Sequence, residues 1–208
     1  MSKINEVGTI EYLSEFLPIG KDIAIIMKRY KLNEEWKDIE KIIIFGYGRQ
    51  ARKIIKKFAE NFEIIAIVDN DSSKWNTVSE LNIPIISFEK AVPFLKKYKI
   101  IVTAMAGNYN NIKKQLSEIG LKEYTNFVQH ETFITEWYCR FKKQICLLKT
   151  DIFVTPFCTL KCKKCSVFIP YMKEKKSICL EDIKDTIDLF FSKIDFLFSM
   201  DIYGGEPF

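Results

Sequence analysis

The residues best suited to chemistry are three cysteines, Cys158, Cys162 and Cys165, at the spacing C-x3-C-x2-C. Close-spaced thiolates bind zinc or iron-sulfur clusters, and in a reducing compartment they do so more often than they form disulfides. The apolar run from Asp151 to Phe157 predicts a strand, so the cysteines follow it on the loop that leaves its end. We therefore interpret them as a metal site.

A second motif, Gly204-Gly205-Glu206-Pro207, ends another apolar run, residues 196–203, which also predicts a strand. A helix is expected between the two strands, over residues 181–194. Its apolar side would carry Ile183, Ile187, Phe190, Phe191 and Ile194. A right-handed crossover would bring the ends of both strands to one edge of a sheet. The cysteine loop and the glycine turn are therefore expected to face a single site.

The first half carries a different set of candidates. Gly46, Gly48 and Ala51 form G-x-G-x-x-A between a predicted strand, residues 42–45, and a predicted helix, residues 49–58. Asp69 ends the next predicted strand, at about the 20-residue interval expected of a ribose-binding carboxylate. We treat Gly46, Gly48 and Asp69 as candidate nucleotide-binding residues. The alternative is that the glycines only make the turn and that Asp69 begins a second turn.

These residues must be positioned by an α/β fold. Alternating strand and helix patterns predict a Rossmann-like, doubly wound parallel sheet over residues 41–129. Further strands are expected at 64–68, 83–87, 100–104 and 124–128, and further helices at 89–98 and 112–119. Residues 1–40 are expected to form a helical preface, with helices near 10–17 and 21–30, and residues 130–150 a connector. In that connector we expect His130 to be a linker side chain, and Cys139 and Cys146 to be packing residues.

Composition excludes several classes of protein. The 208 residues include 32 basic and 27 acidic side chains, a net charge of +5, with both signs mixed along the chain. Nucleic-acid binding usually needs a concentrated basic stripe, so we expect no nucleic-acid partner. No export signal and no apolar stretch of membrane-spanning length is present, so we expect a cytoplasmic chain with no membrane partner.

Residues 41–128 resemble the small Rossmann-like domains of surface-polysaccharide and nucleotide-sugar proteins. The resemblance lies in Ile-Phe-Gly-Tyr-Gly-Arg-Gln-Ala at 44–51, Ile-Val-Asp-Asn-Asp-Ser-Ser-Lys-Trp at 67–75 and Ile-Pro-Ile-Ile-Ser at 83–87. It implies a binding or sensing module more than any reaction. The candidate ligand, a nucleotide or dinucleotide, is inferred from the glycine turn and Asp69.

The second half resembles the radical S-adenosylmethionine superfamily, through Cys158-x3-Cys162-x2-Cys165 followed by the Gly-Gly-Glu-Pro turn at 204–207. The resemblance implies that the three cysteines hold a [4Fe-4S] cluster whose fourth iron binds S-adenosylmethionine. The turn would be the second contact for that cofactor. It further implies a 5'-deoxyadenosyl radical that acts on a small-molecule substrate, and a low-potential electron donor such as a flavodoxin or ferredoxin.

Two features depart from that family's pattern. Many members place an aromatic residue just before the third cysteine, where this chain has Lys164, and Phe168 or Tyr171 are the candidates to replace it. The family's domain is a partial (β/α)6 barrel, of which residues 151–208 supply only the start. We therefore expect a truncated radical S-adenosylmethionine domain, in a fragment of a longer enzyme.

Two alternatives remain open from the residues alone. The three cysteines and Cys179 could form a structural zinc site. The chain could also be a nucleotide-binding regulatory protein that works through Gly46, Gly48 and Asp69, with a vestigial C-terminal part.

Overall fold

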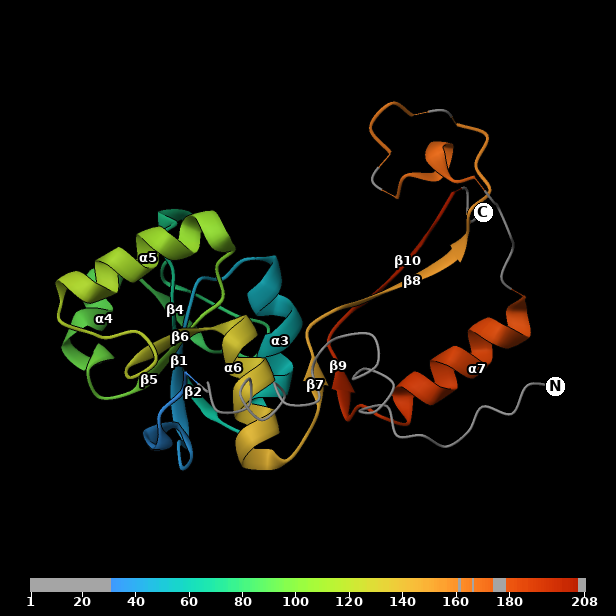
Figure 1. The fold of residues 1–208 in the computed structure, drawn as a ribbon. Helices are drawn as coiled ribbons and strands as arrows, with labels where there is room; N and C mark the ends of the chain where they lie inside the picture. Colours follow the sequence, from blue (N-terminus) through green and yellow to red (C-terminus); the bar gives the residue numbers. More distant parts are fainter. Residues whose placement is uncertain (1–30, 161, 166, 174–178, 206–208) are drawn as a thin grey trace.

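The computed structural model of the chain describes residues 31–160, 162–165, 167–173 and 179–205 (Figure 1). The helices expected near 10–17 and 21–30 fall outside the described residues, as do Glu206 and Pro207 of the glycine turn. Among the helices that the structure describes, none is both long and apolar enough to cross a membrane.

The first half of the chain forms a six-stranded sheet with the strand order β3-β4-β2-β1-β5-β6. The strands are β1 Lys41–Phe45, β2 Glu63–Val68, β3 Thr77–Val78, β4 Pro84–Ile86, β5 Lys99–Val102 and β6 Phe127–Gln129. All neighbouring pairs are parallel except β3 and β4, which are antiparallel. The predicted α/β class with a mostly parallel sheet is therefore confirmed, and β3 is an unpredicted antiparallel edge.

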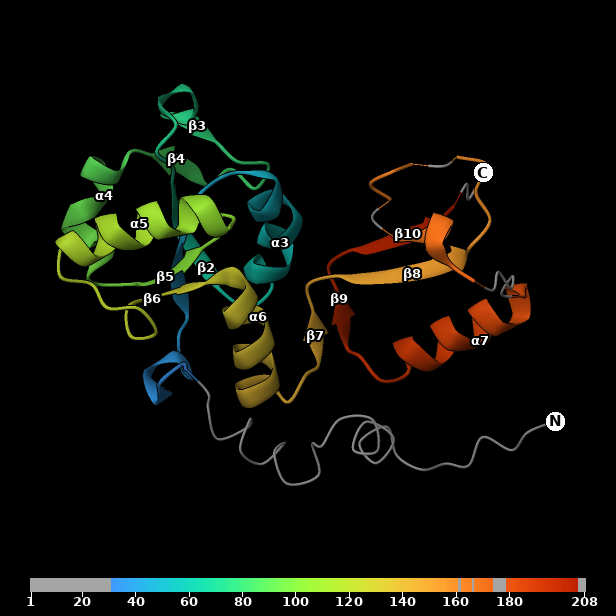
Figure 2. The ribbon, with the colours of Figure 1, turned by 45° about the horizontal axis from the view of Figure 1, so that its top comes forward.

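Helices cover both faces of this sheet (Figures 1 and 2). Along β1, Ile42 and Ile44 belong to one hydrophobic cluster and Ile43 and Phe45 to another, because successive side chains of a strand point to opposite faces. The first cluster includes apolar residues of α3 Arg49–Ala59 and α6 His130–Trp137. The second includes apolar residues of α4 Phe88–Leu95 and α5 Ala106–Glu118. The sheet is thus doubly wound.

The segments that precede β1 and follow β6 in the sequence complete the first hydrophobic cluster. Trp36, in the short 3-10 helix Glu34–Trp36, and Trp137, at the end of α6, are both buried. The Trp137 indole N–H donates to the Trp36 carbonyl at 2.7 Å, and the ring centroids of Trp137 and Phe62 lie 4.7 Å apart. Residues expected to be preface and connector therefore pack into the core of the first α/β unit. A π-helical turn, Tyr138–Lys142, follows α6.

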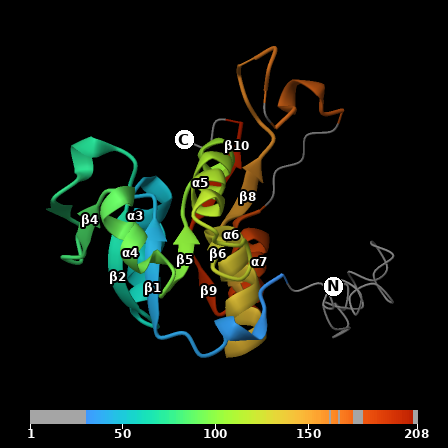
Figure 3. The same ribbon diagram turned by 90° about the vertical axis from the view of Figure 1, so that its left-hand side faces the viewer.

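The second half is a smaller strand-helix-strand unit of β8 Thr150–Thr155, α7 Leu180–Phe191 and β10 Met200–Gly204. Strands β8 and β10 pair in parallel and run side by side in Figures 1 and 3. The strand expected over 196–203 is divided into β9 Phe196–Leu197, which pairs with β7 Cys146–Leu147, and β10. Helix α7 has no buried residue, because two strands and one helix offer little surface to cover it.

Candidate functional site

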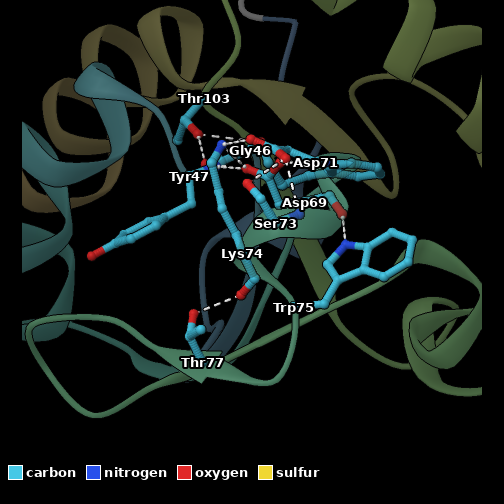
Figure 4. A network of polar contacts seen from close by, with 10 residues as sticks. Gly46, Tyr47, Asp69, Asp71, Ser73, Lys74, Trp75, Thr77 and Thr103 are labelled. Atoms are coloured by element: carbon cyan, nitrogen blue, oxygen red, sulfur yellow. Dashed lines mark hydrogen bonds and ion pairs between the residues drawn. The ribbon is translucent and has the colours of Figure 1, made fainter.

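The glycine loop that follows β1 is held by the two strands that flank β1. Gly46 has a φ of +99°, a left-handed conformation that favours glycine. Its carbonyl accepts a hydrogen bond of 2.5 Å from the Thr103 hydroxyl, just after β5. On the other side, the Tyr47 N–H donates to the Asp69 carboxylate, just after β2, at 2.5 Å (Figure 4). The loop is therefore rigidly placed at the carboxyl edge of the sheet.

The Asp69 carboxylate is turned inward and largely used by the protein itself. The residue is 6% exposed. Besides the Tyr47 N–H, it accepts from the Asp71 N–H at 2.8 Å and pairs with the Lys74 ammonium at 3.1 Å. Three of the about four acceptor positions of an ionised carboxylate are thus occupied. Asp69, predicted from its spacing as a ribose ligand, organises the glycine loop in this structure.

Beside this network lies a cavity of about 790 Å³, at the carboxyl ends of β1, β2 and β5. Its lining includes Gly46, Gly48, Asp69, Lys74, Thr103 and Asn108. In doubly wound sheets this edge is where ligands bind, and the volume lies in the range of small-molecule sites. The structure therefore brings all three predicted nucleotide-binding residues to one cavity.

Two helices begin at this cavity without a side chain to cap them. The residue before α3 is Gly48 and the residue before α5 is Met105, and neither provides a capping hydrogen bond. Neither first turn contains an acidic residue. Free N–H groups and the positive end of the helix dipole at both starts favour an anion.

Gly48 differs from Gly46 because the fold does not require it to be glycine. Its φ is −101°, and a Cβ atom placed there would meet no atom within 4 Å. Ser, Thr, Asp or Asn would ordinarily stabilise a helix at this position. Gly48 instead leaves bare backbone facing the cavity, which suits the close approach of a ligand.

On the side of Tyr47, the glycine loop contacts residues that the sequence patterns did not single out, Arg52 and Glu80. The Arg52 guanidinium lies 4.8 Å from the centre of the Tyr47 ring, and the Tyr47 hydroxyl donates to Glu80. Burial raises the pKa of Tyr47, so the phenol stays protonated. In sequence, Tyr47 and Glu80 are too far apart for a local pattern to link them.

The cysteine loop and the glycine turn meet in the second half of the chain, as the strand-helix-strand order predicts. The Gly205 N–H donates to the Thr155 carbonyl at 2.9 Å, which joins the ends of β10 and β8. A Cβ atom on Gly205 would lie 1.7 Å from the Phe157 carbonyl oxygen and 2.7 Å from the Cys158 Cβ. The turn therefore touches the loop at its first cysteine.

The three thiols share this loop but are not gathered around one point. Cys158 and Cys165 are half-buried and Cys162 is exposed. Within the described ranges, no three His, Cys, Asp or Glu side chains are close enough together to hold a metal ion. Cysteine thiolates are the ligand type that zinc and iron-sulfur clusters use, but their described positions do not form such a site. Loading would require the loop to bring the thiols together.

Cys179, the fourth ligand of the zinc alternative, has a local role. Its Sγ accepts a hydrogen bond from the Asp182 N–H at 3.4 Å and so caps α7. Its side chain is exposed. The structure therefore gives Cys179 a use in the helix start that involves none of the other thiols.

Two aromatic side chains are exposed on the loop near Lys164. Phe168 and Tyr171 are 68% and 67% exposed. Phe168 has a φ of +57°, rare for a bulky residue, and its N–H donates to the Cys165 carbonyl at 3.2 Å. The chain therefore turns sharply after the third cysteine and exposes two aromatic rings on the same loop.

His130 and Cys146 are both core residues. His130, expected as a linker side chain, is the fully buried first residue of α6, and its Nδ1 lies 3.3 Å from the Val102 carbonyl. Burial lowers the pKa of His130 and raises the pKa of the Cys146 thiol. Cys146 thus packs as expected, with no reactive thiolate.

A family model described as C2185-like, N-terminal matches residues 38–127, which is most of the first α/β unit. Among solved structures, the chain is similar to the crystal structure of RSP, a Rex-family repressor. The identity is 16% and the TM-score 0.37, over 57% of this chain and 65% of that one. The match thus spans less than two thirds of the repressor's length. A search of curated proteins finds no match.

Proposed function

We propose that the second half of this chain is the start of a radical S-adenosylmethionine domain, with β8, α7 and β10 as the first strand-helix-strand unit of its partial barrel. The observation that carries the proposal is the contact between Gly205 and the loop at Phe157 and Cys158. A structural zinc site gives no reason for the Gly-Gly-Glu-Pro sequence at the end of the next strand. A cofactor site between the cysteine loop and the next strand end does.

In this proposal Cys158, Cys162 and Cys165 hold a [4Fe-4S] cluster, with one iron left open for S-adenosylmethionine. When bound, the cluster supplies the electron that cleaves this cofactor. The protein's residues hold and orient: the Thr155 carbonyl fixes the turn through the Gly205 N–H. Gly204 and Gly205 let the turn pack directly on Thr155 and on the cysteine loop. The exposed rings of Phe168 and Tyr171 are available to cover the adenine. The reaction acts on a small metabolite, with a low-potential flavodoxin or ferredoxin as electron donor.

Anaerobic reconstitution with iron and sulfide tests this function. We expect about four irons per chain and a visible spectrum that changes when S-adenosylmethionine is added. Cys162→Ser should lose the iron, whereas the matched variant Cys179→Ser should keep it. One tightly held zinc with no iron uptake would contradict the proposal.

We also propose a second function, nucleotide binding in the cavity of the first α/β unit, because Gly48 is bare where the fold would accept a side chain. The uncapped starts of α3 and α5 favour the phosphate groups. A nucleoside diphosphate has both the anionic group and the size for this site.

Calorimetric titration with inorganic pyrophosphate and with ADP and UDP tests this second function. We expect at least one of them to bind and Gly48→Val to abolish binding. The melting temperature should fall only modestly, because valine caps a helix less well than glycine but its Cβ atom meets nothing within 4 Å. Equal binding by the variant would show that the cavity is not the site.

A further inference from the structure

We infer that Lys74 is the residue that selects a diphosphate ligand in the cavity of the first α/β unit, and that Asp69 is the internal counter-charge of Lys74 rather than a ribose ligand. The inference rests on the nucleotide-binding function proposed for this cavity. It assigns to Asp69 a role that its spacing from the glycine loop, Gly46 to Gly48, does not predict.

The first step is the state of Asp69. Its carboxylate already binds two backbone N–H groups and one ammonium, and it is nearly inaccessible to solvent. To bind the two hydroxyls of a ribose it would have to give up bonds that hold the glycine loop in place. Leaving a buried N–H without a partner costs about 1–3 kcal/mol. The structure therefore favours a ligand that leaves Asp69 undisturbed.

The second step is the position of Lys74. Its side chain lines the cavity and reaches back across the glycine loop, where its Nζ lies 3.1 Å from the Asp69 carboxylate and 3.5 Å from that of Asp71 (Figure 4). The side chain remains 30% exposed. Because the two carboxylates already hold it, Lys74 loses little conformational freedom when an anion arrives. It is thus a preplaced cation that lines the same cavity as the uncapped start of α3.

The third step concerns what remains for the rest of a nucleotide. Asp71 is also engaged: hydrogen bonds from Ser73 lower the pKa of its carboxyl group. Asn108 and Asn111 line the same cavity from α5, three residues apart and hence on one face of the helix. Within the described part of the chain, neither amide makes a side-chain hydrogen bond. These amides, rather than Asp69, have capacity to bind a sugar or a base.

Calorimetric titration of the full chain with inorganic pyrophosphate, ADP and UDP tests the inference. Lys74→Gln should weaken pyrophosphate binding about threefold to tenfold, because it removes the placed cation. Asp69→Asn should weaken the binding of pyrophosphate, ADP and UDP alike, because it removes the counter-charge that places Lys74 and an acceptor that holds the glycine loop. Lys114→Gln, the same charge change as Lys74→Gln on an exposed residue of α5 outside the cavity, should change none of these affinities.

The outcomes separate this inference from the function on which it rests. If the wild-type chain binds none of the three probes, the nucleotide-binding function fails and the inference with it. If it binds them and Gly48→Val does not, but Lys74→Gln binds as well as the wild type, the function stands and the inference is overturned. A loss of ADP and UDP binding in Asp69→Asn, with pyrophosphate binding unchanged, would identify Asp69 as the ribose ligand and also overturn it. Melting curves of each variant confirm that it is folded. If Asp69→Asn is unstable, Lys74→Gln alone tests the inference, because the Lys74 side chain is partly exposed and its replacement disturbs the fold less.

Discussion

At the residue scale, three glycines are glycine for different physical reasons. Gly46 has a left-handed backbone, Gly205 has no room for a Cβ atom, and Gly48 has neither constraint. The first two are required by the fold around them. The fold would accept a side chain at Gly48, so a substitution there tests the proposed nucleotide-binding role without a steric clash within the protein.

We expect Gly205→Ala to separate the glycine turn from the cysteine loop. The added methyl group would overlap the backbone at Phe157, which cannot move aside as a flexible side chain could, so the end of β10 must shift away from β8. Iron content after reconstitution should fall to a small fraction of the wild-type value, while the first α/β unit keeps its melting temperature. The matched control is Gly107→Ala, since a Cβ there meets nothing within 4 Å. Full iron content in Gly205→Ala would rule out a role for this contact.

At the element scale, α6 depends on its surroundings more than on its own sequence. Its first residue is His130, and the side chain of the preceding residue, Gln129, makes no capping hydrogen bond. The helix buries Phe133, Ile134 and Trp137 against the sheet. A charged imidazole is disfavoured there twice, by burial and by the positive end of the helix dipole. The helix therefore holds its first residue in the neutral form.

This predicts a pH dependence of stability. Burial lowers the pKa of His130 below its ordinary 6.5, so below that pH the unfolded chain binds the extra proton and the folded chain does not. The contribution of neutral His130 to the stability of the folded chain is therefore complete above pH 6.5 and is lost as the pH falls. His130→Phe should flatten the melting temperature between pH 7 and 5, measured against the wild type. Carboxyl groups with lowered pKa, such as Asp71, act only at more acidic pH, below about 4. Equal slopes for the two proteins over this interval would show that His130 does not titrate differently on unfolding.

At the scale of the whole molecule, the two halves differ in how completely they are packed. The sheet of the first half has a buried hydrophobic cluster on each face. In the second half, β8 has no buried side chain and α7 leaves Leu180, Leu189 and Phe191 exposed. A parallel sheet is normally covered on both faces. The second unit is therefore expected to open at lower free energy than the first.

Thiol labelling followed by mass spectrometry should reveal this difference. In the metal-free chain we expect fast labelling of the exposed Cys162 and Cys179, and labelling of the buried Cys146 only when the first unit unfolds. After reconstitution with iron, Cys158, Cys162 and Cys165 should become protected together while Cys179 stays reactive. Protection of all four would point instead to coordination by four thiolates.

Much of the fold could be predicted because its signals are local. The buried positions of α3, Ala51, Ile54, Ile55 and Phe58, are the ones its 3.6-residue period predicts. The apolar pattern predicts the start of α5 at residue 112, but the helix begins at Ala106, because residues 107–111, Gly-Asn-Tyr-Asn-Asn, carry a single large apolar side chain and so show no helical period. β3 and β7 have two residues each and exist only through their partner strands. The division of residues 196–203 into β9 and β10 likewise depends on which strand each part meets.

The sequence by itself determined the residue types at both candidate sites, and the order of its elements predicted that the cysteine loop and the glycine turn would meet. Only the tertiary structure decided that Asp69 turns inward to the glycine loop, that Lys74 is held over the cavity and that the space above Gly48 is open. The physical reason is that these features depend on partners from different elements. Asp69 binds the N–H of Tyr47, 22 residues away, and Thr103 binds Gly46 across 57 residues. No local pattern carries information about contacts that exist only once the strands have assembled.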